Sequence, residues 1–192
     1  MIRRPPRSTQ GVSSAASDVY KRQLYNLERS INWNYSSNRW WLMLHTKIID
    51  IKKEKISSSN AEVFIKSSSF GASIIFTGTV RNINENKEVT GMTYDSHDEL
   101  VLKSFNEIYE EAEDKLKITN KAVFIEHIKG YVGLGEISII IAVACKHRDE
   151  AYILSRYIIE EIKKRSPIWK KEHYKNEQSE WLKGNPLSNE KN

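Results

Sequence analysis

The chain has 192 residues, of which 39% are hydrophobic and 29% charged, a balance typical of one globular domain rather than a disordered or fibrous protein. The longest apolar runs, Trp40–Leu44 and Ile137–Cys145, fall far short of the ~20 residues that span a bilayer. A single cysteine, Cys145, excludes an internal disulfide framework and predicts a reducing, cytoplasmic location.

The formal net charge of +5 is concentrated near the N-terminus. Residues 1–23 hold most of the basic excess, with Arg3, Arg4, Arg7, Lys21 and Arg22 against Asp18. The rest of the chain is therefore nearly neutral. Although the sequence pI is ≈ 9.1, a neutral body argues against a nucleic-acid-binding protein.

The N-terminal segment has no apolar periodicity. Residues 1–23 lack the apolar core of a secretory signal, and Pro5-Pro6 suits the amphipathic helix of a transit peptide poorly, so the segment is similar to translated vector or adapter sequence. Residues 24–42 are either read-through ahead of a start at Met43 or a genuine, poorly ordered extension. We expect the folded domain at 43–187 and a C-terminal tail at 188–192.

Four strands are predicted. Gly71–Val80 is β-branched and aromatic, and the polar turn Asn82–Lys87 leads to a second strand through Val89–Tyr94. The stretch before them, Ser57–Glu62, has the composition of a loop. The other two strands are Ala122–Ile128 and Ile137–Cys145, which we expect to be joined by a hairpin turn with Gly130, Gly133 and Gly135 at positive φ.

Two amphipathic helices are predicted from apolar residues that recur every three or four positions. The first, His97–Lys117, has the stripe Val101, Phe105, Ile108, Ala112 and Leu116. The second, Asp149–Arg165, has the stripe Ala151, Leu154, Ile158 and Ile162 and ends before Pro167. The order β-β-α-β-β-α predicts an α+β domain in which helices cover one face of a mainly antiparallel sheet.

Residues typical of metal or nucleophile chemistry are sparse. Cys145 and His147 lie two positions apart, but no second ligand pair with zinc spacing accompanies them, so we expect no metal site. The same pair lacks an orienting partner for nucleophilic catalysis, and Cys145 is expected in the core. Gly130-Tyr-Val-Gly133-Leu-Gly135 opens a strand and does not follow the dinucleotide-binding pattern.

Cations form the remaining candidate group. Lys163–Arg165 lie where a helix ends, so the helix dipole alone accounts for them, but Arg148 lies in a first turn, where a cation is disfavoured unless an anion binds. Arg81 follows a buried strand directly. A solvated helix surface and a site for a small anionic substrate both remain open on these residues.

The helix geometry adds a constraint. Arg148 and Lys163 are fifteen residues apart on one predicted helix, which separates them by ~22 Å. One small molecule does not reach both on the same chain. If both belong to one site, that site is composite and forms where two copies meet across a two-fold axis.

Three segments resemble the large, catalytic subunit of molybdopterin synthase, in the order and spacing of that family: FTGTVRN (Phe76–Asn82), KHRDEAY (Lys146–Tyr152) and IKKRSPIWKKE (Ile162–Glu172). The similarity runs from about Lys47 to Leu182. It implies an α/β-hammerhead fold. The chain departs from the family at Tyr94-Asp-Ser-His97-Asp-Glu-Leu100-Val101, which puts the dimer or partner surface in doubt more than catalysis.

The resemblance also implies a function. This family is a sulfurtransferase that converts cyclic pyranopterin monophosphate to molybdopterin by installing the two sulfurs of a dithiolene. The sulfur arrives as a thiocarboxylate on the C-terminal Gly-Gly of a small ubiquitin-like subunit. Two large subunits form a central homodimer, with one small subunit at each end of the heterotetramer. No metal or other cofactor is implied, because molybdenum is added later.

Carried over by motif position, the implied substrate-binding residues are Thr79, Val80, Arg81, His147, Arg148, Lys163, Lys170, Lys171 and Glu172. Lys163 and Lys170 are the implied catalytic residues. The guanidinium groups suit the phosphate. Nearby cations such as Arg165 and Lys171 favour a neutral lysine amine for acid–base or covalent work; alternatively the lysines stay charged and stabilise an oxyanion. A docking module without turnover is the alternative function, and nucleic-acid binding a weaker one.

Overall fold

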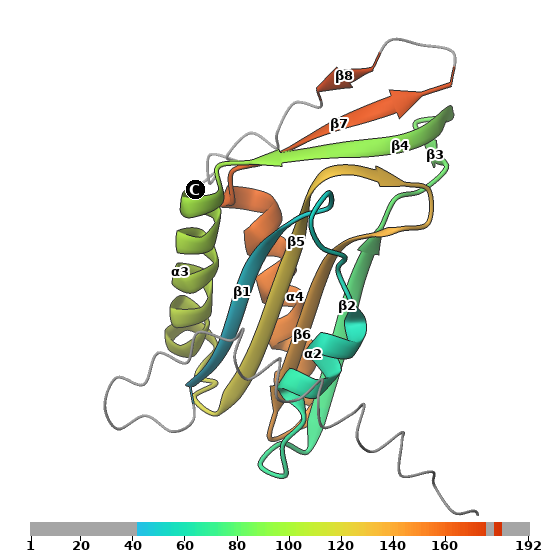
Figure 1. Cartoon of the computed structure of the whole chain (residues 1–192). Helices are drawn as coiled ribbons and strands as arrows, with labels where there is room; N and C mark the ends of the chain where they lie inside the picture. The colour runs from blue at the N-terminus through green and yellow to red at the C-terminus, as the bar shows by residue number, and fades with distance from the viewer. Residues whose placement is uncertain (1–41, 176–178, 182–192) are drawn as a thin grey trace, which may run out of the picture. The chain divides into compact units, whose positions relative to one another are not determined.

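The computed structural model describes residues 42–175 and 179–181 (Figure 1). The predicted extension, apart from Leu42, and the predicted tail lie outside these residues. In chain order the elements are β1 (Leu42–Asp50), α2 (Ser58–Ile65), β2 (Ala72–Thr79), β3 (Ile83–Asn84), β4 (Lys87–Ser96), α3 (Asp98–Leu116), β5 (Lys121–Gly133), β6 (Ile137–Cys145), α4 (Arg148–Arg165), β7 (Ile168–Tyr174) and β8 (Glu180–Trp181). None of the helices in the described ranges is long and apolar enough to cross a membrane.

The sheet has two parts that share β5. In the first part, β6 lies between β2 and β5, and β1 pairs with the other edge of β5 as the one parallel neighbour among the described strands. In the second part, β4 pairs with the end of β5, and β7 and β8 follow outward (Figure 1). The predicted α+β class with a mainly antiparallel sheet is confirmed.

Gly130 allows β5 to continue from one part of the sheet into the other. Its φ of 115° lies in the region that favours glycine, and a Cβ added there would come within 2.6 Å of the Ile51 side chain. Gly130 and Gly135 both have positive φ, as predicted, whereas Gly133 does not. Gly130 and Gly133 lie within β5 rather than in the turn, because this strand extends beyond the predicted end at Ile128.

The main core lies between α3, α4 and one face of the first part of the sheet. Both predicted helix stripes are buried there, with only Leu116 partly exposed. The helix boundaries differ from the predicted ones by one residue at most. Cys145 is buried, as predicted, and burial raises the pKa of its thiol to about 11.

The prediction that helices cover only one face is wrong. The short helix α2 begins within the stretch predicted as a loop, continues beyond its end, and packs on the opposite face, against β5, β6 and β2. Its buried residues are Ala61, Phe64 and Ile65, and the Phe64 ring lies 5.7 Å from that of Phe124. One helix of eight residues with serines at its start carries too few apolar positions to reveal a periodic stripe.

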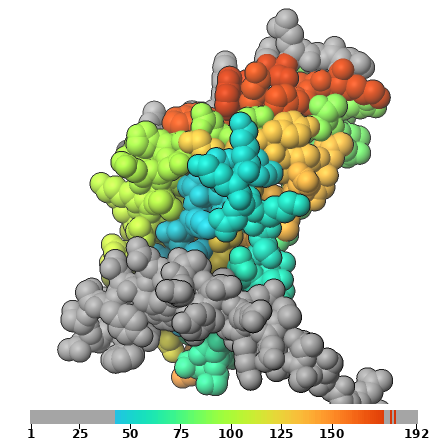
Figure 2. Space-filling model, in the orientation of Figure 1, coloured from blue at the N-terminus to red at the C-terminus, as the bar shows by residue number. Residues whose placement is uncertain are grey.

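Four of the strands were also not predicted: β1, β3, which lies within the predicted polar turn, β7 and β8. The sequence of β7, IWKKEHY, is strongly charged and does not alternate cleanly between apolar and polar residues. Its pairing with β4 over Val89–Ser96 nevertheless carries the predicted site residues Lys170–Glu172 to the second part of the sheet. In Figure 2 the atoms of β7 adjoin those of the β3–β4 hairpin.

Candidate active site

Predicted site residues lie at both ends of the β2–β6 pair. Thr79, Val80 and Arg81 form the group at one end, and His147 and Arg148 form the group at the other. Ala72 pairs with Cys145, whereas Thr79 pairs with Ile137. Arg81 follows Thr79 and His147 follows Cys145, so the eight residues of β2 separate the two groups by roughly 23 Å. Helix α4 then returns antiparallel to β6, which brings Lys163 to the Thr79 end and leaves Arg148 at the other.

Strand β7 divides its three predicted residues between two faces. Lys170 is opposite Tyr94 and Glu172 is opposite Met92 on β4, so these two share one face of the sheet. Lys171 is opposite Thr93 and points to the other face. The structure therefore brings Lys170 and Glu172 together and separates Lys171 from them.

Glu172 is a buried carboxylate with two hydrogen-bond donors. It is 4% exposed, and its Oε2 accepts a hydrogen bond of 2.9 Å from Asn84 Nδ2 and a short one from the Tyr174 hydroxyl. The hydrogen bond to this carboxylate raises the pKa of Tyr174. On its other side the Asn84 amide accepts from Arg81 Nη2 at 3.5 Å. Arg81 and Glu172, both predicted, are thus linked through Asn84.

Asn84 and Tyr174 were not singled out by the sequence analysis. Asn84 lies within the predicted polar turn, three residues after Arg81, where an asparagine is ordinary turn chemistry. Tyr174 lies two residues after Glu172, at a spacing that places both on one face of a strand. If β7 had been predicted as a strand, this spacing would have indicated that Tyr174 lies beside Glu172.

Thr79 and Val80 support Arg81 through the backbone. Val80 is 3% exposed; its N–H donates to Glu136 O at 3.2 Å and its carbonyl accepts from Gly135 N at 2.8 Å. The register shifts between Gly78 and Thr79, so the strand is irregular just before this point. With both of its main-chain groups paired, Val80 anchors the segment that presents Arg81.

At the other end of the β2–β6 pair, His147 and Arg148 lie at the start of α4. Both are exposed, and Glu150 Oε2 accepts a hydrogen bond of 3.2 Å from the His147 N–H. Asp149 and Glu150 supply negative charge in the first turn, so the chain itself complements the helix dipole there. Arg148 Nε lies 3.8 Å from Asp149, and both side chains are largely in solvent.

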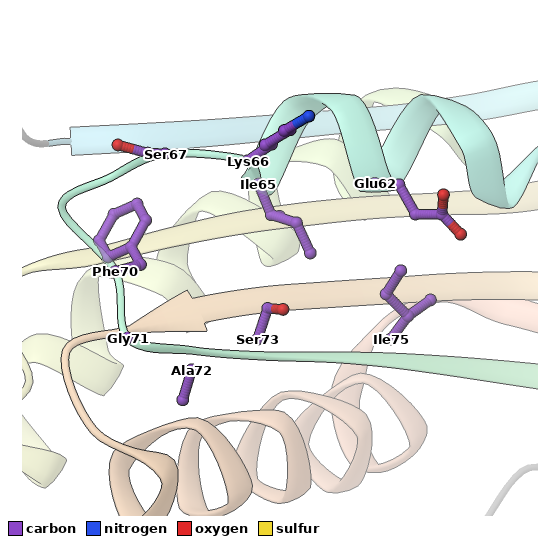
Figure 3. Close-up of a pocket in the computed structure, with 9 residues that line it drawn as sticks. All are labelled: Glu62, Ile65, Lys66, Ser67, Phe70, Gly71, Ala72, Ser73 and Ile75. Carbon is purple, nitrogen blue, oxygen red and sulfur yellow. The ribbon is translucent and has the colours of Figure 1, made fainter. Parts of the chain in front are cut away.

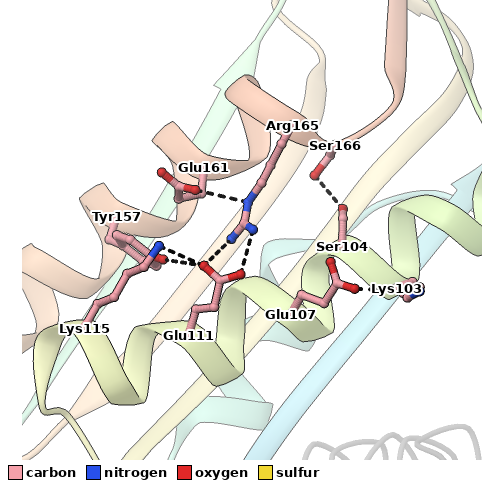
Figure 4. Close-up of polar contacts among 9 residues, drawn as sticks. All are labelled: Lys103, Ser104, Glu107, Glu111, Lys115, Tyr157, Glu161, Arg165 and Ser166. Carbon is pink, nitrogen blue, oxygen red and sulfur yellow. Dashed lines mark hydrogen bonds and ion pairs between the residues drawn. The ribbon is translucent and has the colours of Figure 1, made fainter. Parts of the chain in front are cut away.

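The last turn of α4 is fixed to α3 by an ion-pair network (Figure 4). Arg165 donates two hydrogen bonds to Glu111, of 2.7 and 2.9 Å, and its Nε lies 3.0 Å from Glu161. Ser104 and Ser166 also join the two helices at 2.7 Å. The charge of Arg165 is therefore balanced by two carboxylates, which weakens the expectation that it favours a neutral Lys163.

One cavity in the described part of the chain lies away from the predicted residues. A cavity of about 360 Å³ lies between α2 and the start of β2 and is lined by Glu62, Ile65, Lys66, Ser67, Phe70, Gly71, Ala72, Ser73 and Ile75 (Figure 3). None of the predicted site residues is among them. At roughly 23 Å apart, the two groups do not both contact one small molecule within a single copy.

Comparison with known proteins gives consistent matches. A family model described as MoaE protein matches residues 51–165. The chain is 38% identical over 143 residues to the molybdopterin synthase catalytic subunit of Synechococcus elongatus, covering 74% of this chain and 86% of that relative. It is 34% identical over 140 residues to the subunit of the same name from Pyrococcus abyssi, covering 72% and 93%.

The fold also matches a solved structure. The crystal structure of molybdopterin synthase from Staphylococcus aureus aligns with a TM-score of 0.63 and 26% identity, over 77% of this chain and 99% of that chain. This match extends through most of the described residues and confirms the fold predicted from the resemblance.

Proposed function

The chain belongs to the MoaE protein family, and on that premise we propose that it is the catalytic subunit of a molybdopterin synthase. As a sulfurtransferase, it takes sulfur from the terminal thiocarboxylate of a small ubiquitin-like subunit and installs it on cyclic pyranopterin monophosphate. The proposed site needs no metal, and the proposed location is the cytoplasm.

Two features support this proposal: Arg81 and Lys163 lie toward the same end of the β2–β6 pair, and Asn84 links Arg81 to Glu172, which shares one face of β7 with Lys170. Arg81 emerges from an anchored segment, and its guanidinium suits a phosphate group. Lys163 and Lys170 are exposed, and among residues 42–175 and 179–181 no carboxylate lies within 4.0 Å of either amine. A site with uncompensated cations suits an anionic substrate and an anionic peptide terminus.

Lys163 and Lys170 are the proposed catalytic residues, either as acid–base groups or as stabilisers of the oxyanion on the partner's terminal carbonyl. Replacement of Lys163 by arginine separates these roles, because arginine keeps the charge but does not act as a neutral amine. A pH–rate profile of Lys163→Arg close to wild type would eliminate the neutral-amine role. Loss of activity at every pH would eliminate simple charge stabilisation.

The second group, His147 and Arg148, joins this site from a second copy in our proposal. One stripe along α4 consists of Arg148, Tyr152, Arg156 and Lys163. The Tyr152 side chain in this stripe is 68% exposed. This stripe is adjacent to β2, the edge strand of the sheet. Two copies packed antiparallel about a two-fold axis near the middle of the stripe would bring Arg148 of one copy to Lys163 of the other.

The test is reconstitution. The purified chain is mixed with a thiocarboxylated small subunit and cyclic pyranopterin monophosphate, and the dithiolene product is measured. We expect product only when all three components are present. A stable complex with the small subunit that never yields product would instead indicate a docking module.

A further inference from the structure

We propose that Asn84 is a positioning residue that orients Arg81 toward the substrate phosphate while keeping it apart from the Glu172 carboxylate. This inference rests on the proposed function, since it deepens the role of the same site.

The hairpin that carries Asn84 has a defined geometry. Asn84 ends β3 and pairs with Lys87 of β4, and the two turn residues Glu85 and Asn86 have φ values of 47° and 65°. Two consecutive left-handed residues are typical of a tight turn that matches the twist of the strands. The turn therefore fixes the Asn84 backbone close to β7, where its side chain reaches Glu172.

Each end of the Asn84 amide has one partner. The Glu172 oxygen accepts hydrogen bonds, so the NH₂ group of Asn84 faces it at 2.9 Å. A guanidinium only donates, so the amide oxygen faces Arg81, at 3.5 Å. Tyr174 donates to the same Glu172 oxygen and completes the anchor on the far side.

A neutral group between Arg81 and Glu172 has an electrostatic consequence. No carboxylate in the described ranges lies within 4.0 Å of the Arg81 guanidinium. The neutral Asn84 amide therefore orients the Arg81 side chain, and no ion pair neutralises its positive charge. The charge of Glu172 is met by neutral donors. Arg81 consequently keeps its capacity to form a charge-assisted pair with an incoming phosphate.

This arrangement predicts different effects for two substitutions. Asn84→Asp keeps an acceptor for Arg81 but makes it anionic, so an internal ion pair competes with the phosphate, and the donor to Glu172 is lost. Asn84→Ala removes the orientation without adding a competitor. Because a phosphate contact is made in both the ground state and the transition state, we expect KM to rise by about tenfold for Asn84→Asp and by about threefold for Asn84→Ala, with kcat nearly unchanged.

The experiment measures KM and kcat in the reconstituted reaction, together with the inhibition constant of inorganic phosphate as a competing anion. Asn86→Asp is the matched control, because it adds the same charge two residues away, on a turn residue with left-handed φ that aspartate tolerates. Thermal unfolding of each variant reports any purely structural damage, which would lower the melting temperature without raising the phosphate inhibition constant.

A parallel rise in KM and in the phosphate inhibition constant for Asn84→Asp, larger than for Asn84→Ala and absent for Asn86→Asp, supports the inference. A folded Asn84→Asp enzyme whose two constants stay within about twofold of wild type overturns it. If Asn84→Asp does not fold, unchanged constants in Asn84→Ala overturn it equally. A wild-type chain that makes no product with an active small subunit contradicts the proposed function instead.

Discussion

Arg165 and Glu111 form a bidentate ion pair that joins the last turn of α4 to the middle of α3, with donor–acceptor distances of 2.7 and 2.9 Å. Lys115 Nζ contacts the same carboxylate at 2.9 Å. Arg165 lies two positions after Lys163, so these contacts hold in place the turn of α4 that carries this proposed catalytic residue. The hydrogen bonds from Arg165, followed by those from Lys115, lower the pKa of Glu111 from 4.5 to about 2.

This pair predicts a dependence of stability on pH. Glu111 regains its ordinary pKa on unfolding, so the unfolded chain binds the extra proton between pH 4.5 and about 2. The stabilisation is therefore complete above pH 4.5 and is lost as the pH falls toward 2. Because Glu111 is about one-third exposed, we expect Glu111→Gln to cost only about 1 kcal/mol at pH 7.

The measurement is denaturant unfolding of wild type and Glu111→Gln at pH 7 and at successively lower pH. The difference between the two should shrink as the pH falls. Glu107→Gln is the matched control, since Glu107 lies one turn earlier on α3 and its contact with Lys103 is 3.9 Å long and exposed. An equal loss of stability from both substitutions would show that the Arg165–Glu111 pair stabilises the fold no more than the exposed Lys103–Glu107 contact does.

Local patterns account for the parts of the fold that were predicted correctly. The stripes of α3 and α4 and the apolar run of β6 each bury one continuous set of residues, so their periodicity is visible within the segment. Helix α2 and strand β7 differ because their stability comes from partners elsewhere in the chain. Phe64 is buried against β5, and β7 exists through its pairing with β4.

The site likewise combines residues that local patterns reveal with a contact that depends on the fold. Arg81, Lys163 and Glu172 lie in recognisable motifs, but the hydrogen bond between Asn84 and Glu172 joins residues that are 88 positions apart. Only the fold brings the β3–β4 hairpin beside β7. The separation of Arg148 from Lys163 could be predicted, because it follows from the rise of a single helix.

The bend in β5 gives a prediction about stability. Gly130→Ala places a Cβ within 2.6 Å of the Ile51 side chain and forces a φ of 115° on a residue that disfavours it. We expect a loss of about 2–4 kcal/mol, from steric overlap and backbone strain together. Urea unfolding measures this loss.

Gly135→Ala is the matched control for that substitution. Gly135 also has positive φ, of 75°, but a Cβ there meets nothing within 4 Å. Its replacement should cost only about 1 kcal/mol, from the backbone alone. Equal losses at both positions would mean that contact with Ile51 contributes nothing and that the bend tolerates a side chain.

The proposed composite site is tested by combining two inactive variants. Arg148→Ala and Lys163→Ala homodimers should each be inactive, because both of their sites carry a lesion. A heterodimer of the two, purified through different tags, has one site with both lesions and one with neither if the residues come from different copies. We therefore expect it to recover about half of the wild-type activity.

The control heterodimer combines Arg81→Ala with Lys163→Ala. Both residues lie at the same end of one chain, so each of its two sites keeps one lesion, and it should stay inactive. Recovery in the control would show that Arg81 and Lys163 of one chain serve different sites. No recovery in the Arg148–Lys163 pair would contradict the antiparallel arrangement of α4. Activity of a monomeric chain would remove the second copy from the mechanism altogether, because the ~22 Å between Arg148 and Lys163 on one helix would then have to be spanned by a single subunit.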